Sequence, residues 1–322
     1  MEVAQDFIEQ GYAAVKILHH CKIATSSYYY KSRGGQRGRK PYAKIYDKNG
    51  NEVGTDTILT EIEKLFSKPY VDYGSYKTYR YLKDKKGYSI SKHSVYNIMK
   101  NNQLTRMRYQ QSSKKTKKNY VKDLIPKVIW PFQFFEFDIK YMWVQGKRRN
   151  IQVLTIIDVF SRMNLGQTIA YKIKSKDVIK LFQEAITTFG LPDQFTVRCD
   201  NGSQFVALEV QNYLVGQGVT QEFTKPSTPQ QNAHIESYHS ILERAVCQRV
   251  EFSDQADVRV KMTEFRDFYN FERIHGGIGY SNPFNYLLRN ETEFNQSVSF
   301  QKSFLLVSQM YKEFLKCPAF TG

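Results

Sequence analysis

The sequence predicts an α/β protein in which a mixed five-stranded sheet with flanking helices follows all-α helix-turn-helix modules. Three observations support this prediction: the order of strand-like and helical segments after residue 130, the helical spacing of apolar residues before residue 105, and a change of charge between the two parts. Residues 1–130 contain 26 Lys and Arg against 11 Asp and Glu, whereas residues 131–322 contain 21 against 20. A chain of 322 residues is also longer than one core usually supports, so we expect two or three domains.

Residues 11–30 are expected to form two short helices that look like the back half of a helix-turn-helix. The first helix has one apolar face, formed by residues at helical spacing: Ala14, Ile17, Leu18 and Cys21. Residues 23–27, Ile-Ala-Thr-Ser-Ser, supply a turn and an N-cap for the second helix. Residues 31–40 are rich in Gly and Arg, so they cannot pack a core but can lie along phosphates. We therefore assign residues 1–40 to a helix-turn-helix-like segment followed by a basic linker.

Residues 41–118 are predicted to form a second, basic helical domain. Three helices are expected between residues 55 and 105, with apolar positions turned inward: Ile58, Ile62, Phe66, Tyr76, Tyr79, Leu82, Val95 and Ile98. Ser91 would cap the third helix at its N-terminus. Three short helices with a tight second turn are typical of a winged-helix or helix-turn-helix fold, whose last helix reads DNA.

The charge of this domain favours DNA binding over an ordinary helical bundle with a polar outer face. Lys92, His93 and Asn97 would face outward on the recognition helix. Four lysines in the segment that follows would track the DNA backbone rather than read bases: Lys114, Lys115, Lys117 and Lys118. For the N-terminal half as a whole, the alternative is a basic surface that contacts solvent and does not bind nucleic acid.

Residues 119–290 have the pattern of a catalytic core, with a meander of strands followed by alternating helices and strands. The expected strands are 132–144, 151–160, 163–173, 195–199 and 220–224, and the expected helices are 176–189, 205–215 and 232–246. Gly146 would supply a positive φ in the hairpin between the first two strands. This order gives a mixed sheet with helices on both faces, the ribonuclease-H-like layout. Residues 291–322 form a C-terminal tail, for which we expect no role beyond packing in a dimer or an end complex.

The composition argues against a zinc module, a disulfide framework and a membrane protein. The four cysteines are scattered without a C-x-x-C pair, and the six histidines lack zinc-ligand spacing. Cys199 is more typical of a buried strand cysteine than of a reactive one. The first ten residues contain no signal-peptide pattern, and no apolar run approaches 18 residues. We therefore expect a soluble, intracellular protein.

Three carboxylates, Asp138, Asp200 and Glu236, carry the most chemical information. Asp138 is expected in the middle of the first strand, Asp200 at the end of the fourth, and Glu236 in the first turns of the last helix. In a ribonuclease-H-like layout these acids meet at one end of the sheet, although each taken alone is more typical of a structural residue. Three converging acids can hold two Mg²⁺ ions, which drive in-line attack on a phosphodiester. We therefore predict that all three are catalytic and metal-binding, with Mg²⁺ as cofactor and Mn²⁺ able to replace it.

The segments around these acids resemble the integrase core that retroviral integrases share with bacterial insertion-sequence transposases. The resemblance rests on four blocks: Asp200-Asn-Gly-Ser-Gln-Phe205, the polar loop from Ser227 to Ser237, Ile157-Asp-Val-Phe-Ser-Arg162, and Arg273-Ile-His-Gly-Gly-Ile-Gly-Tyr-Ser-Asn-Pro283 with Tyr269-Asn270 before it. The last block is similar to that of the two-frame OrfB-type transposases. Residues 74–104 resemble the helix-turn-helix that those proteins carry ahead of the core.

The resemblance implies a DDE transposase that binds element terminal repeats, cleaves 3′ ends and joins them to target DNA by metal-dependent transesterification. Its partners would be double-stranded DNA, further copies of the chain in at least a dimer, and the product of an upstream frame. It also implies a cytoplasmic location on the bacterial nucleoid. Asn232 and His239 become candidates for DNA or scissile-phosphate contact, although His239 could equally be a surface histidine. Arg273 and His275 are expected to order the last helix, with contact to DNA as the alternative, and Asp158 is expected to be structural.

Two departures from the family and three rival functions accompany this interpretation. Retroviral integrases carry a zinc-binding His/Cys module in front, which this chain lacks, and the tail does not look like a β-barrel. The first rival is a metal-dependent DNA nuclease that performs no strand transfer. The second is a catalytically silent DNA-binding repressor, against which the three intact acids argue. RNA as substrate is disfavoured because no RNA-binding signature is present.

Overall fold

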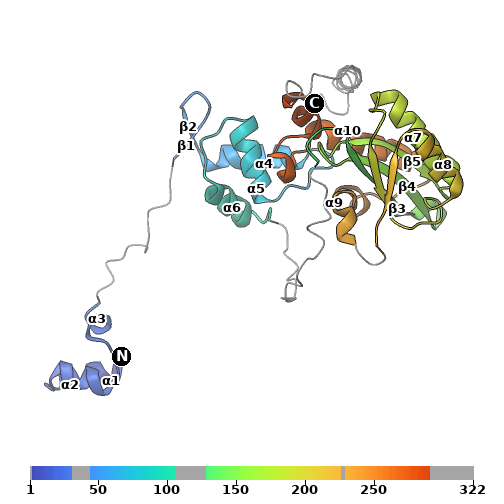
Figure 1. The fold of residues 1–322 in the computed structure, drawn as a ribbon. Helices are drawn as coiled ribbons and strands as arrows, with labels where there is room; N and C mark the ends of the chain where they lie inside the picture. Colours follow the sequence, from blue (N-terminus) through green and yellow to red (C-terminus); the bar gives the residue numbers. More distant parts are fainter. Residues whose placement is uncertain (1, 31–43, 106–127, 226–228, 291–322) are drawn as a thin grey trace. The chain divides into compact units, whose positions relative to one another are not determined.

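The computed structural model describes residues 2–30, 44–105, 128–225 and 229–290 (Figure 1). The chain divides into two compact units, residues 1–44 and 45–322. The expected domain boundaries at residues 40 and 118, the four lysines of residues 114–118 and the C-terminal tail lie outside the described residues. None of the helices described is long and apolar enough to cross a membrane.

The first unit contains three short helices, α1 (Glu2–Glu9), α2 (Ala14–His20) and α3 (Thr25–Tyr28). Leu18 of α2 and Ala4 of α1 are buried, whereas Cys21, expected on the same apolar face as Leu18, is exposed. The expected side-chain cap of α3 is absent, because Ala24 occupies the N-cap position and no side chain bonds there. The two helices expected in residues 11–30 are therefore present, but their buried face is narrower than the spacing suggested.

The second unit begins with a helical module made of α4 (Thr55–Phe66), α5 (Ser75–Arg80) and α6 (Lys92–Asn101). Its small core contains the predicted inward residues Ile58, Ile62, Leu82, Val95 and Ile98. As predicted, Ser91 caps α6: its side chain accepts a hydrogen bond of 3.0 Å from the backbone N–H of Ser94. A short antiparallel hairpin that the sequence did not predict, β1 (Ile45–Tyr46) and β2 (Glu52–Val53), precedes these helices.

One predicted inward residue of this module, Tyr76, faces outward instead. Its side chain is 46% exposed, and its ring lies 5.2 Å from that of Tyr280. The cause is the helical spacing itself: the chain advances about 100° per residue, so Tyr76, six residues before Leu82, lies about 120° away from it around the helix. Thr78 and Leu82 therefore point inward, and Tyr76 does not.

The core is a five-stranded mixed sheet in the order β5-β4-β3-β6-β7. Its strands are β3 (Phe134–Val144), β4 (Arg149–Asp158), β5 (Asn164–Ala170), β6 (Thr196–Cys199) and β7 (Thr220–Phe223). The first three form an antiparallel meander, and β6 and β7 run parallel to β3. This strand order confirms the predicted ribonuclease-H-like fold class.

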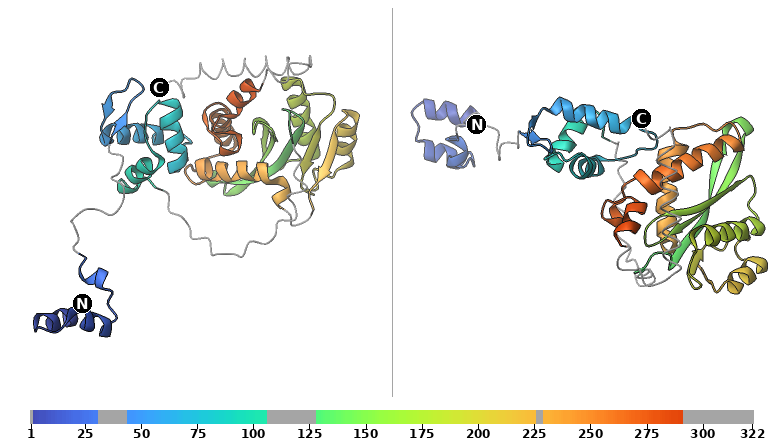
Figure 2. Two further views of the ribbon diagram at one scale, coloured as in Figure 1. Left: turned by 60° about the vertical axis from the view of Figure 1, so that its left-hand side comes forward. Right: turned by 90° about the horizontal axis from the view of Figure 1, so that it is seen from above.

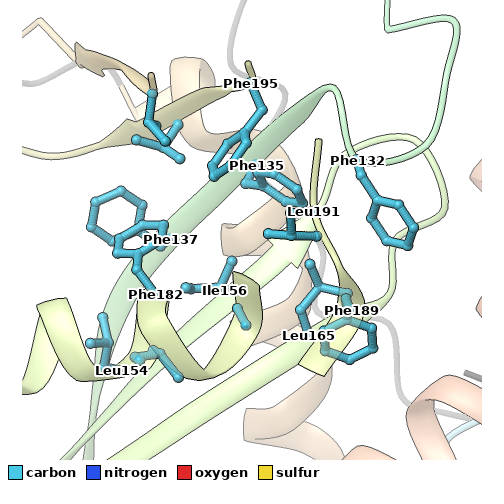
Figure 3. Close-up of a cluster of buried hydrophobic side chains, with 14 of the residues drawn as sticks. Phe132, Phe135, Phe137, Leu154, Ile156, Leu165, Phe182, Phe189, Leu191 and Phe195 are labelled. Atoms are coloured by element: carbon cyan, nitrogen blue, oxygen red, sulfur yellow. The ribbon is translucent and has the colours of Figure 1, made fainter. Parts of the chain in front are cut away.

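Helices cover both faces of the sheet, as Figure 2 shows. Helices α7 (Ser175–Phe189) and α8 (Leu208–Gly216) pack on one face. There the ring centre of Phe137 lies 5.1 Å from that of Phe182 (Figure 3). It lies 4.8 Å from that of Phe205. Helices α9 (Ala233–Leu242) and α10 (Gln255–Asp267) pack on the other. A π-turn, Glu243–Cys247, extends α9, and α11 (Pro283–Arg289) follows α10. Since strand side chains alternate between faces, Glu136 and Asp138 both point toward α9.

The turn between β3 and β4 corrects the expected role of Gly146. The left-handed residue is Arg148, with φ of 48°, and Gly146 has no positive φ. A side chain at residue 146 would instead collide with the backbone of Ser253, whose neighbour Phe252 accepts a hydrogen bond from the Gly146 N–H. Glycine is therefore needed there for close approach rather than for backbone conformation.

Candidate active site

Asp138 lies in the middle of β3, on the face covered by α9. Its Oδ1 accepts a hydrogen bond of 2.7 Å from the backbone N–H of Ile139, which favours the ionised form. Burial, and after it the charges of Asp200 and Glu236, outweigh that bond and raise the pKa of Asp138 to about 7. The electrostatic coupling indicates that the three predicted acids face a common region.

Asp200 follows the last residue of β6 and is fixed by a tight turn. Its Oδ1 accepts a hydrogen bond of 2.9 Å from the backbone N–H of Gly202, and the Asn201 side chain donates to the Thr224 carbonyl at 2.7 Å. A Cβ at residue 202 would collide with the Gln204 side chain and lie 3.0 Å from Oδ1 of Asp200. The Asp200-Asn-Gly sequence thus sets the direction of the carboxylate as the chain leaves the sheet.

Glu236 comes from the first turn of α9, as the sequence predicted. Burial and the charge of Glu136 raise its pKa above the ordinary value for a glutamate. In the ranges that the structure describes, no three His, Cys, Asp or Glu side chains form a group that could already hold a metal ion. The charges of Asp200 and Glu236 therefore act on Asp138, but the three acids do not form a closed ligand cage in the described residues.

Two buried charged residues that the sequence analysis did not single out hold the start of α9. Glu136 accepts three hydrogen bonds from His234 and Ile235, and the Nη1 of Arg198 donates to the backbone carbonyl of Gln231. The available signal was a charged residue two positions before Asp138 and another two before Asp200, each in a strand that is otherwise mainly apolar. Charges in such strands are rarely buried without partners.

His239 and Asn232, the expected DNA contacts on and before α9, are both largely covered. Nδ1 of His239 lies 3.6 Å from Oδ2 of Asp138, and burial, with the nearby charge of Lys140, lowers the pKa of His239 to about 4. Asn232 is buried directly before α9. Among the atoms that the structure describes, Nε2 of His239 and Oδ1 of Asn232 have no hydrogen-bond partner. Their contact with DNA stays a prediction.

The predicted recognition helix presents two of its three candidate residues to solvent. Lys92 and His93 are exposed at the start of α6, and Asn97 is half-buried one turn later. The role of these residues in DNA binding also stays a prediction.

The residues expected to be structural are buried and well bonded. Asp158 is fully buried and accepts hydrogen bonds from the N–H of Phe132 and from both the N–H and the hydroxyl of Ser161. Arg273 forms a buried ion pair with Asp72, which also pairs with Arg244 at 3.4 Å. Within the second unit, this pair joins the segment before α5 to the core. Cys199 is buried, and burial raises its pKa to about 12, so it is not a thiolate.

Two family models, each described as "Integrase core domain", match residues 130–229 and 217–283. Taken together, the two matches show that residues 130–283 are similar to the integrase core domain. The matched residues run from just before β3 to the start of α11, so this integrase core contains the sheet, all three acids and α9.

Two relatives are named as products of insertion elements. The chain is 25% identical over 142 residues, 44% of its own length and 56% of the other, to the "Transposase for insertion sequence element IS904" of Lactococcus lactis. It is 23% identical over 177 residues, 55% and 61% of the two lengths, to the "Insertion element IS407 uncharacterized 31.7 kDa protein" of Burkholderia multivorans. The chain thus spans little more than half of the length of these relatives.

Solved retroviral integrases give weaker matches. The HTLV-2 integrase catalytic core domain in complex with magnesium (trimeric form) has a TM-score of 0.39 at 14% identity, covering 49% of this chain and 97% of that one. The catalytic core domain of BIV integrase has a TM-score of 0.38 at 19% identity, covering 51% and 99%. Because these TM-scores are low, the fold class rests on the strand order of this chain, β5-β4-β3-β6-β7, and not on these matches.

Proposed function

We propose that this protein is a DDE transposase, a polynucleotidyl transferase that cleaves the 3′ ends of its element and joins them to target DNA. The single observation that carries the proposal is the placement of the three acids within the region that matches the integrase core domain: Asp138 on β3 under α9, Asp200 directly after β6, and Glu236 in the first turn of α9. Burial and, after it, the charges of Asp200 and Glu236 raise the pKa of Asp138, and binding of a cation would relieve this cost.

The three carboxylates fit a site for Mg²⁺, or for Mn²⁺ in its place. Mg²⁺ prefers oxygen ligands from few carboxylates together with waters and substrate phosphates, so an open group of acids suits it better than a closed cage. Asp138, Asp200 and Glu236 would hold two ions, whose chemistry would be to activate a hydroxyl nucleophile and to stabilise the leaving 3′-oxygen. The task of the protein is to keep Asp138 ionised and to hold the three carboxylates around the scissile phosphate. A covalent protein–DNA intermediate is not expected, because the nucleophile is water or a 3′-hydroxyl.

We further propose double-stranded DNA and a second copy of the chain as partners. The excess of Lys and Arg before residue 131, and the exposure of Lys92 and His93 on α6, support contact with element ends through the helical modules. Joining two ends to one target requires two active sites, so at least a dimer would act. The location would be the cytoplasm, on the nucleoid.

The test uses purified protein, Mg²⁺ or Mn²⁺ and a labelled duplex carrying the terminal repeat of the host element. Asp200→Asn should abolish cleavage, whereas the control Glu184→Gln, at an acid on the outer surface of α7, should cut normally. A precut end with a free 3′-hydroxyl then tests joining. Cleavage without joining would favour the nuclease alternative, and repeat binding without metal-dependent cleavage would favour the repressor.

A further inference from the structure

A row of three charged residues crosses the sheet one pleat behind the predicted catalytic acids. Glu136 on β3 is in register with Arg198 on β6, and Arg198 is in register with Glu222 on β7. Glu136 and Arg198 each stand two residues before a predicted catalytic acid, Asp138 and Asp200. Since strand side chains alternate, each of the two lies on the same face as the acid that follows it.

Glu136 holds the first turn of the helix that carries Glu236. Its Oε2 accepts hydrogen bonds from the backbone N–H groups of His234 and Ile235 at 2.8 and 2.9 Å. Its Oε1 lies 2.7 Å from Nδ1 of His234. Glu136 is only 2% exposed, so water cannot replace these bonds. The first N–H groups of a helix have no partner within the helix, and here a buried carboxylate of the sheet supplies one.

Arg198 holds the chain directly before that helix. Its Nη1 donates to the Gln231 carbonyl at 2.9 Å, while its Nε and Nη2 donate to Glu222 at 3.0 and 2.7 Å. The guanidinium lies 4.9 Å from the centre of the Phe134 ring, and Arg198 is 8% exposed. Gln231 in turn accepts a hydrogen bond of 2.6 Å from the Lys225 N–H. The entry into α9 is therefore fixed to two neighbouring strands.

We propose that Glu136 and Arg198 are positioning residues that set Glu236 against Asp138 and Asp200 by fixing the start of α9 to the two strands that carry those aspartates. This inference rests on the proposed function, since it assigns the row a role in metal-dependent cleavage. Glu236 lies two residues after His234 and one after Ile235, so a shift of the first turn would move its carboxylate directly. Residues that orient metal ligands from behind typically change metal affinity 10- to 100-fold when they are replaced.

The decisive comparison is between Glu136→Ala and Glu136→Gln. Alanine leaves two buried N–H groups without an acceptor, so the first turn of α9 should shift. Glutamine keeps an oxygen that can accept both N–H groups, and its amide can donate to Nδ1 of His234 in the matching tautomer. The matched control is Asp158→Ala, which also removes a buried acceptor of three hydrogen bonds on a strand of the same sheet but does not touch α9.

Three readouts separate positioning from general loss of stability. Hydrogen exchange at the amides of His234 and Ile235 reports the first turn of α9 without any metal. Mn²⁺ binding, followed by electron paramagnetic resonance with the metal alone, reports the acids. Single-turnover cleavage reports the rate constant separately from the half-saturating DNA concentration.

We expect Glu136→Ala to speed exchange at both amides, to weaken Mn²⁺ binding about tenfold and to slow cleavage at unchanged half-saturating DNA. Glu136→Gln should remain close to the wild type in all three measurements, and Arg198→Lys should fall between Glu136→Gln and Glu136→Ala. Asp158→Ala should lower only the melting temperature. Normal Mn²⁺ binding and cleavage in Glu136→Ala would overturn the positioning role, as would equal defects in the Ala and Gln variants. If the wild type neither binds Mn²⁺ nor cleaves, the proposed function itself fails, and this role fails with it.

Discussion

Asp138 and Asp158 are two aspartates on paired strands of one sheet, Asp138 half-buried and Asp158 fully buried, and their surroundings differ in kind. Asp158 ends β4 and accepts three hydrogen bonds, two of them from Ser161. Asp138 accepts one, from Ile139, and faces the charges of Asp200 and Glu236. Burial raises the pKa of both. The difference is that one carboxylate is stabilised by donors, whereas the other is destabilised by like charges.

This contrast, more than the difference in burial, is what we expect between an acid with a structural role and an acid proposed to bind a metal ion. A buried carboxylate that is fully hydrogen-bonded holds two chain segments together, here residue 132 and the turn after β4. A buried carboxylate facing other carboxylates lowers stability unless a cation is present. Such an arrangement persists in a folded protein where function requires it.

The largest expected effect is on catalysis, through Asp138→Asn. Losing one carboxylate of the site should slow metal-dependent cleavage by at least about 1,000-fold, equivalent to roughly 4 kcal/mol of transition-state stabilisation. Asp158→Asn, the same change at the aspartate on the neighbouring strand, should keep the rate per folded molecule within a few fold. Single-turnover cleavage with folded protein quantified by circular dichroism measures both. A comparable loss in the two variants would erase the distinction between the acids.

The second effect is on stability, for which we expect Asp158 to matter more than Asp138. Asp158→Ala should lower the free energy of unfolding by about 3 kcal/mol, because it leaves two buried N–H groups and one hydroxyl without an acceptor. Urea unfolding of the protein at pH 7 in the presence of a chelator measures the change. Asp138→Ala, made as the control, should lower the free energy of unfolding by less. An equal loss in the two variants would show that the partners of Asp138 stabilise the fold as much as those of Asp158 do.

The third effect is a dependence of stability on pH. Asp138 has a pKa of about 7 in the folded protein against an ordinary value of 3.8, so the folded state binds its proton more tightly. The stabilisation of the folded state that results from this proton binding is therefore fully present below about pH 4 and is lost as the pH rises through 7. Asp138→Asn carries no charge, so it should stabilise the metal-free protein by about 2 kcal/mol at pH 8, after allowance for solvent screening, and hardly at pH 4.

Unfolding experiments at pH 4 and pH 8, with chelator present, test whether Asp138→Asn stabilises the protein only at the higher pH. Adding Mg²⁺ at pH 8 should raise the melting temperature of the wild type and leave that of Asp138→Asn almost unchanged. A variant that is less stable than the wild type at pH 8 without metal would contradict the assigned repulsion.

The sequence was sufficient for the fold because the relevant signals are local. Alternating and continuous apolar segments placed all five strands of the integrase core, and the Ser91 cap placed the start of α6. Tyr76 was predicted wrongly because it lies six residues before Leu82, which places it about 120° away from the buried face, whereas Thr78, four residues before Leu82, is buried.

The row behind the acids could not be predicted because it depends on strand register. Glu136 and Arg198 become neighbours only when β3 pairs with β6 in this register, and no sequence pattern near either residue predicts the register. The Asp72–Arg273 pair likewise joins segments about 200 residues apart in the chain. Local patterns therefore located Asp138, Asp200 and Glu236 but not the residues that hold the start of α9.

The smallest expected effect concerns His239, the neighbour of Asp138 on α9. Its pKa of about 4 keeps it neutral at working pH, and 3.6 Å separates its Nδ1 from Oδ2 of Asp138, beyond hydrogen-bond range. It therefore does not relieve the repulsion that distinguishes Asp138 from Asp158. His239→Gln should slow cleavage by less than about fivefold, the worth of a neutral hydrogen bond, and leave the pH midpoint of cleavage in place. A pH–rate profile of the variant beside the wild type measures both, and a shift of the midpoint by one unit would make His239 a charged partner of Asp138 after all.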